Sequence, residues 1–116
     1  MEKKDITNGG EFLIKETEAE SVFIPEEFDE EQQMIAQSCH DFVEQEIDPI
    51  LDRIDSLEEG LTVSLLDKAG ELGLLGISVP EDLGGFGKNF VTSMLTTEAL
   101  GGSHSFAVSI LSLIHI

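Results

Sequence analysis

Two side chains in this sequence could do chemistry on their own, an isolated glutamate and a single cysteine. Glu98 lies among apolar neighbours just before a Gly-Gly pair, so its carboxylate could serve as a general base. No titratable residue nearby in the sequence would tune Glu98, so a structural hydrogen-bonding role is the preferred interpretation. Cys39 falls on an apolar stripe of the sequence, which indicates a buried, unreactive thiol rather than a nucleophile.

The histidines and glycines match no known metal or phosphate motif. His40, His104 and His115 are far apart, and neither H-x-x-x-H nor H-E-x-x-H occurs, so we expect no metal ion. The Gly87-Lys88 pair lacks the upstream glycine and the following Ser or Thr of a phosphate-binding loop, and a turn is the better interpretation. We therefore expect no catalytic, metal-binding or cofactor-binding residue in this sequence.

The composition is strongly acidic, yet it contains enough apolar residues for a core. Of 116 residues, 24 are acidic and 6 basic, giving a formal charge of −18, while 41% are hydrophobic. Such a surface repels phosphate backbones and anionic lipids, so we expect no nucleic-acid partner, and no apolar stretch is long enough for a membrane span. A lone cysteine and the lack of a secretory signal indicate a cytoplasmic protein.

The acidic residues are concentrated in the first half of the sequence. Residues 1–60 hold 19 acidic and 4 basic side chains, whereas residues 61–116 hold 5 and 2. This asymmetry indicates that the second half is buried or covered by a partner. One hypothesis is therefore a non-enzymatic, acidic helical module that binds a partner protein through its apolar half.

Residues 1–28 are expected to form an N-terminal extension, and a helix should follow. Two apolar clusters, residues 12–14 and 22–24, flank an acidic tract, and they favour an ordered strap over a mobile tail because exposed phenylalanines are costly. Asp29 can cap a helix that runs to Ile47, with Pro49 ending or kinking it. Apolar residues recur along this helix at spacings of three and four, at Ile35, Cys39, Phe42, Val43 and Ile47.

Three further helices are predicted after residue 60. Thr62 can cap the second helix, which Gly73 ends, and residues 74–79 then form an extended apolar connection. Asn89 can cap the third helix, and either Ser103 or Ser105 can cap the fourth. Period-two alternation is lacking, so the fold class should be all-α. The residues of the third helix expected to face inward are Phe90, Val91, Met94, Leu95 and Ala99.

An ordered set of motifs resembles a known family. The run ELGLLGISVPEDLGGFG at residues 71–87 resembles the N-terminal helical domain of the acyl-CoA dehydrogenases. The pattern F-x-x-x-E-I-x-P at residues 42–49, Asp55, and Glu98-Ala99-Leu100-Gly101 agree with that resemblance. The extension, through residues 9–13, is similar to the longer members, including the very-long-chain type.

The resemblance implies an FAD enzyme that oxidises acyl-CoA thioesters to trans-2-enoyl-CoA. In that family a glutamate removes the α-proton, a β-hydride moves to the flavin, and electrons pass to electron-transfer flavoprotein. The family architecture is an N-terminal helical domain, a middle β domain and a C-terminal helical bundle, usually in a homo-oligomer. An acyl-CoA oxidase on the same fold is a close alternative.

The resemblance also divides the chain and points to two substrate-binding residues. Residues 29–110 correspond to an incomplete N-terminal helical domain, and residues 111–116 look like a foreign or artefactual tail. The middle and C-terminal domains are missing, so this fragment is expected to be inactive. Alignment with the family places acyl-chain contacts near Val108 and Ser109, for which ordinary core packing is the alternative.

Overall fold

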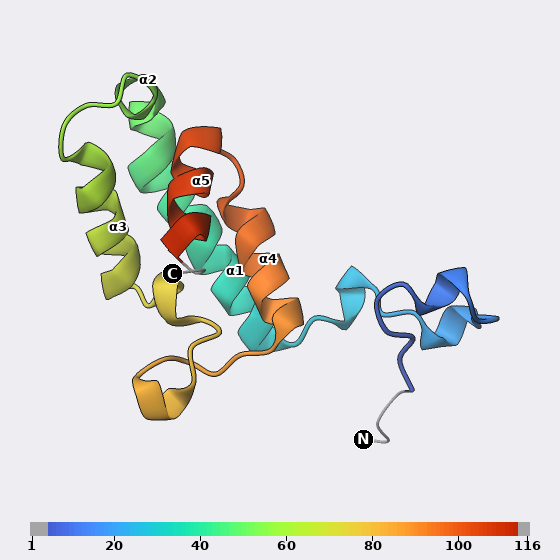
Figure 1. Cartoon of the computed structure of the whole chain (residues 1–116). Coiled ribbons are helices and arrows are strands. Elements are labelled where there is room, and N and C mark those ends of the chain that lie inside the picture. Colours follow the sequence, from blue (N-terminus) through green and yellow to red (C-terminus); the bar gives the residue numbers. More distant parts are fainter. Residues whose placement is uncertain (1–4, 114–116) are drawn as a thin grey trace. The chain divides into compact units, whose positions relative to one another are not determined.

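The structure, a computed structural model, describes residues 5–113, which fold into helices and turns (Figure 1). The chain divides into two compact units, Met1–Glu30 and Glu31–Ile116. No strand occurs within residues 5–113, and the all-α fold class is confirmed. Of the predicted tail at residues 111–116, residues 114–116 lie outside the described residues, and its foreign origin stays a prediction.

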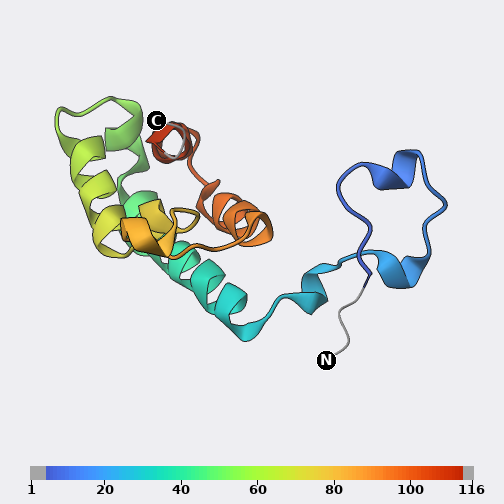
Figure 2. The same cartoon turned by 60° about the horizontal axis from the view of Figure 1, so that its bottom comes forward.

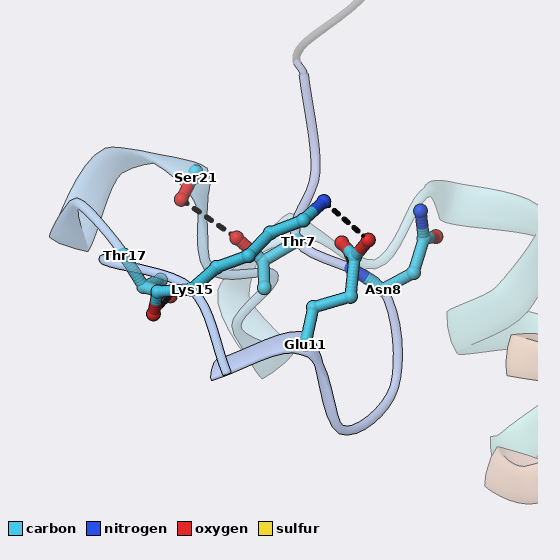
Figure 3. Close-up of polar contacts among 6 residues, drawn as sticks. All are labelled: Thr7, Asn8, Glu11, Lys15, Thr17 and Ser21. Carbon is cyan, nitrogen blue, oxygen red and sulfur yellow. Dashed lines mark hydrogen bonds and ion pairs between the residues drawn. The ribbon is translucent and has the colours of Figure 1, made fainter. Parts of the chain in front are cut away.

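The first unit is a looped segment built from short turns. Two hydrogen bonds close it: the Thr7 amide donates to the Ser21 carbonyl at 2.9 Å, and the two hydroxyls are 2.9 Å apart (Figure 3). Inside the loop, Lys15 Nζ contacts Glu11 Oε1 at 2.5 Å (Figure 3). Its 3₁₀ turns are Glu11–Leu13, Ala19–Ser21 and Pro25–Glu27.

The two apolar clusters of this unit behave differently from each other. Phe12, Leu13 and Ile14 are 62%, 75% and 85% exposed, so the first cluster is not buried within this unit. In the second cluster, residues 22–24, the ring of Phe23 packs edge-on against that of Phe28, with ring centroids 5.4 Å apart. Hydrogen bonds within its turns therefore hold this unit together more than the burial of apolar side chains does.

The second unit begins with a long helix that changes pitch before its proline. Helix α1 (Glu30–Phe42) continues into a π-helical turn, Val43–Ile47, and then a 3₁₀ turn, Asp48–Ile50, that contains Pro49. Proline has no amide hydrogen to donate, so the regular ladder cannot pass through it. The chain resumes as α2 (Leu51–Asp55), so of the two outcomes predicted at Pro49, an end or a kink, the helical path continues past the proline.

Helix α3 (Leu61–Glu71) begins and ends at glycines in the left-handed region. Gly60 precedes the helix with φ of +77°, and no side chain caps it, so the predicted Thr62 cap is wrong. The predicted end at Gly73 is confirmed, because this residue follows the helix with φ of +77°. A glycine at each end lets the chain reverse without a side-chain cap.

The segment between α3 and α4 folds back on itself, and its predicted extended form is wrong. It contains the 3₁₀ turns Leu74–Gly76 and Glu81–Leu83. Its two sides are joined where the Phe86 amide donates to the Gly76 carbonyl at 2.9 Å and the Gly87 amide to the Val79 carbonyl at 2.8 Å. The close approach explains Gly85, whose Cβ would meet the Val79 backbone, whereas Gly84 and Gly87 have φ of +88° and +59°, in the left-handed region that glycine adopts readily.

The cap of α4 (Phe90–Leu100) matches the sequence prediction, but the buried face does not. Asn89 Oδ1 accepts a hydrogen bond from the Thr92 amide at 3.0 Å, which confirms the cap. The buried residues of α4 are Thr92, Thr96, Ala99 and Leu100, whereas Phe90, Val91 and Met94 are exposed. The inward face was therefore predicted wrongly for these three residues, and only Ala99 and the half-buried Leu95 follow the prediction.

Helix α5 (His104–Leu113) completes the core of the second unit. It contacts α2, α3 and α4 (Figures 1 and 2). Phe106 is fully buried and its ring lies 5.8 Å from that of Phe42 in α1. The largest fully buried side chains of this core are Cys39, Ile47, Ile54, Leu65, Leu100, Phe106 and Ile110.

Candidate functional site

The candidate site is the outward face of α5, whose position three residues fix. Ser103 directly precedes the helix, and its Oγ accepts a hydrogen bond from the Phe106 amide at 3.4 Å, so Ser103 rather than Ser105 is the cap. Ser105 Oγ instead donates to Asp55 Oδ1 at 2.6 Å, which joins the start of α5 to the end of α2. The buried Phe106 then fixes which face of α5 points outward.

Val108 and Ser109 lie on α5 with no charged side chain beside them on the helix. Val108 is 66% exposed, so it is not core of this unit. Ser109 is half-buried, and its Oγ donates to the Ser105 carbonyl at 3.1 Å. One turn on, Ser112 Oγ donates to the Val108 carbonyl at 2.7 Å. The hydroxyls of this face are thus satisfied inside the helix, and the exposed imidazole of His104 lies one turn before Val108 on the same side.

Glu98 and Cys39, the two residues that the sequence singles out for possible chemistry, do not lie on the outward face of α5. Glu98 is exposed, and its carboxylate makes no hydrogen bond or ion pair with any of residues 5–113, so the preferred structural role is not seen. Cys39 is fully buried in α1, and burial raises the pKa of its thiol to about 11. The predicted burial of Cys39 is confirmed.

The basic residues of the described chain form ion pairs with glutamates. In residues 5–113, no group of three or more His, Cys, Asp or Glu is placed to hold a metal ion. Every lysine and arginine in the same range is paired with a glutamate. These pairs are Lys15 with Glu11, Arg53 with Glu58, Lys68 with Glu46, and Lys88 with Glu31.

A pocket beside α4 was missed at the level of sequence. It has a volume of about 520 Å³, and no charged side chain lines it. In the sequence, the pocket is indicated only by the apolar residues of α4, and these were predicted to face the core. We call it the α4 pocket; it is lined by Leu74, Leu75, Ile77, Ser78, Phe90, Ser93, Met94, Thr96, Thr97 and Leu111.

None of the helices that the structure describes combines the length and apolar character needed to cross a membrane.

Comparison with curated proteins finds acyl-CoA dehydrogenases. A probable acyl-CoA dehydrogenase of Bacillus subtilis is 42% identical over 111 residues, covering 94% of this chain and 19% of the relative. The mitochondrial short-chain specific acyl-CoA dehydrogenase of Rattus norvegicus is 38% identical over 80 residues, which are 69% of this chain and 19% of that protein. The chain thus spans about a fifth of the length of the curated relatives it matches.

A solved structure and a family model agree with these relatives. The crystal structure of an acyl-CoA dehydrogenase complexed with FAD from Bacillus anthracis superimposes with a TM-score of 0.82 at 41% identity, over 90% of this chain and 18% of that one. The family model described as "Acyl-CoA dehydrogenase, N-terminal domain" matches residues 29–116. The chain belongs to the acyl-CoA dehydrogenase family, within its N-terminal helical domain.

Proposed function

We propose that this chain is the N-terminal helical part of an FAD-dependent enzyme that oxidises acyl-CoA to trans-2-enoyl-CoA. The family match over residues 29–116 is the observation that carries the proposal. The neighbour from Bacillus anthracis is itself complexed with FAD. The full-length enzyme would pass electrons to electron-transfer flavoprotein and would be a cytoplasmic homo-oligomer. Residues 29–110 are proposed as its N-terminal domain and residues 1–28 as an extension; the family model matches through residue 116, so it gives no support to a foreign origin of residues 111–116.

The outward face of α5 supplies part of the wall against which the acyl chain packs. Val108 offers an exposed apolar side chain, and the Ser109 hydroxyl is bonded within the helix. A hydrocarbon chain needs a surface without free hydrogen-bonding groups, since a buried unpaired group is unfavourable. Val108 and Ser109 are therefore proposed as substrate-binding residues.

The described residues offer the FAD diphosphate no unpaired cation. The diphosphate of FAD needs cations or a cradle of amides, and every lysine and arginine from residue 5 to residue 113 is already paired with a glutamate. When bound elsewhere in the full-length protein, FAD would supply the hydride acceptor. This segment contributes neither that acceptor nor the base that removes the α-proton, so the chain alone is proposed to be inactive.

A chimera tests the function directly. It is the Bacillus subtilis relative in which this chain replaces the matched residues; it should purify with flavin absorbance, and an acyl-CoA should bleach that absorbance as enoyl-CoA forms. The 116-residue chain alone should bind no flavin and show no turnover. A chimera that folds but stays colourless, or a chain that turns over acyl-CoA unaided, would contradict the proposal.

A further inference from the structure

One side-chain hydrogen bond ties the helix of the candidate site to another helix. Ser105 lies in the first turn of α5, and its Oγ donates to Oδ1 of Asp55, the last residue of α2, at 2.6 Å. Within residues 5–113, no other side-chain hydrogen bond joins α5 to another helix. The two residues are 50 positions apart in the sequence, so only the tertiary fold brings them together.

The other polar contact at the start of α5 is weak. The cap hydrogen bond from the Phe106 amide to Ser103 Oγ is 3.4 Å long, at the outer limit for such a bond. The bond from Ser105 to Asp55 is short and its acceptor is a carboxylate, and hydrogen bonds to charged acceptors are the stronger kind. The Asp55 carboxylate is therefore the stronger of the two polar restraints on the first turn of α5.

Ser105 connects this restraint to the two proposed substrate-binding residues. Its backbone carbonyl accepts the Ser109 hydroxyl at 3.1 Å, while its own hydroxyl is bonded to Asp55. Val108 and Ser109 follow Ser105 by three and four residues, so the three lie on one side of the helix, whereas Phe106 is buried in the core. A rotation of α5 about its axis would move Val108 directly, and the bond to Asp55 opposes that rotation.

We propose that Asp55 is a positioning residue for acyl-chain selection, because it holds Ser105 and thereby the face of α5 that carries Val108. A hydrocarbon chain is recognised by the shape of the wall against which it packs, so a small displacement of that wall changes how well each chain length fits. Asp55 lies on α2, outside the acyl wall, and acts only through Ser105. The inference rests on the proposed function, since it requires the outward face of α5 to contact the acyl chain.

Steady-state kinetics of the chimera test the inference, with butyryl-, octanoyl- and palmitoyl-CoA as probes. Asp55→Ala should raise KM for the preferred acyl-CoA about threefold to tenfold with little change in kcat, and should flatten the dependence of kcat/KM on chain length. Asp52→Ala is the matched control, because it removes an exposed carboxylate of the same helix that makes no hydrogen bond with α5 in the described chain. An unchanged profile in Asp55→Ala, or an equal loss for all three substrates, would overturn the inference.

Three further variants test whether Asp55 acts through Ser105. Asp55→Asn keeps an Oδ1 acceptor for the hydroxyl, so its profile should lie much closer to that of the parent than the profile of Asp55→Ala does. Ser105→Ala removes the donor and should give the same profile as Asp55→Ala. The double variant Asp55→Ala and Ser105→Ala should be no worse than either single variant, because both changes break one contact. Additive losses, or an Asp55→Asn profile as flat as that of Asp55→Ala, would contradict this assignment.

Hydrogen exchange of the 116-residue chain gives a check that needs neither flavin nor turnover. In Asp55→Ala, the amides of residues 107–109 should exchange about threefold or more faster than in the parent, because the first turns of α5 open more often. The amides of α1 should keep the parent rates. Equal rates in α5, or the same acceleration in α1, would overturn the inference. A chimera without flavin or turnover refutes only the proposed function, whereas an active chimera whose Asp55→Ala variant keeps the parent profile refutes only the positioning.

Discussion

Cys39 shows how burial controls reactivity at a single position. Its pKa is raised to about 11 by burial, so at pH 8 its thiolate fraction is roughly a hundredfold below that of an exposed thiol. Iodoacetamide should therefore label the native chain about a hundredfold more slowly than the chain unfolded in urea. Mass spectrometry over time measures both rates, and equal rates would contradict the burial of this thiol.

The same pKa shift gives stability a dependence on alkaline pH. A thiol with a raised pKa in the folded state stabilises the fold fully below its unfolded pKa of about 8.5, and this contribution is lost as pH rises towards 11. Urea denaturation should show the stability falling from about pH 8.5 upwards. Cys39→Ala is the matched variant, and its stability should fall less over that range.

Val108 is the residue through which the proposed acyl wall can be tested. Val108→Phe adds bulk to an exposed position of α5, so in the chimera it should shorten the preferred acyl chain and lower kcat/KM for long substrates about tenfold. Val63→Phe, at a position 63% exposed on α3, controls for added surface bulk and should leave the preference unchanged. An unaltered preference in Val108→Phe would remove this residue from the substrate site.

The start of α4 depends on one side chain, unlike the start of α3. Asn89 Oδ1 accepts hydrogen bonds from both the amide and the hydroxyl of Thr92, so Asn89→Ala should destabilise the fold by about 1 to 2 kcal/mol. Thr62→Ala is the control, because no side chain caps α3, and its effect should stay within about 0.5 kcal/mol. Urea titrations measure both values, and equal losses would contradict the assigned caps.

The loop before α4 depends on a close backbone approach at Gly85. A Cβ on Gly85 would lie 2.2 Å from the Val79 carbonyl oxygen, too close for the loop to keep its hydrogen bonds. Gly85→Ala should therefore lower the melting temperature by several degrees, corresponding to about 1 to 3 kcal/mol. Gly76→Ala in the same loop meets its nearest atom at 3.6 Å and should be far milder.

Several structural elements could be predicted from local sequence signals, and the wrong prediction for the buried face of α4 has a clear physical cause. Asn89, Pro49 and Gly73 act through their own backbone chemistry, so the α4 cap, the change of pitch after α1 and the end of α3 were predictable. The orientation of α4 was not, because apolar residues were assumed to face the one visible core. Thr92 and Thr96 are buried instead because each hydroxyl finds a hydrogen bond, which hydropathy alone does not report.

The candidate site was predictable only through the family resemblance. Nothing in the local pattern of Val108 and Ser109 distinguishes them from core residues; the structure shows that Phe106 and Ile110 take the buried positions of α5. Ser93 was also unremarkable in sequence, since an unpaired hydroxyl becomes visible only when every neighbouring donor and acceptor has been placed. Sites made by tertiary contacts therefore need the fold before they can be recognised.

At the scale of the whole molecule, charge and apolar surface oppose each other. A formal charge of −18 makes copies of the chain repel, whereas exposed apolar residues such as Phe90 and Met94 favour their association. Repulsion reaches about 10 Å at 0.1 M salt and shortens as salt is added. The balance between the two forces should therefore move with ionic strength.

The isolated chain should accordingly be helical but prone to associate. Circular dichroism should show helix, while size-exclusion chromatography should give broad elution that shifts to larger species as salt is raised, because screening removes the repulsion and leaves apolar attraction. The double variant Phe90→Ser and Met94→Ser should shift less than the parent chain if α4 supplies the contact. A sharp monomer peak at every salt concentration would mean that the exposed apolar face is too weak to act outside a longer protein.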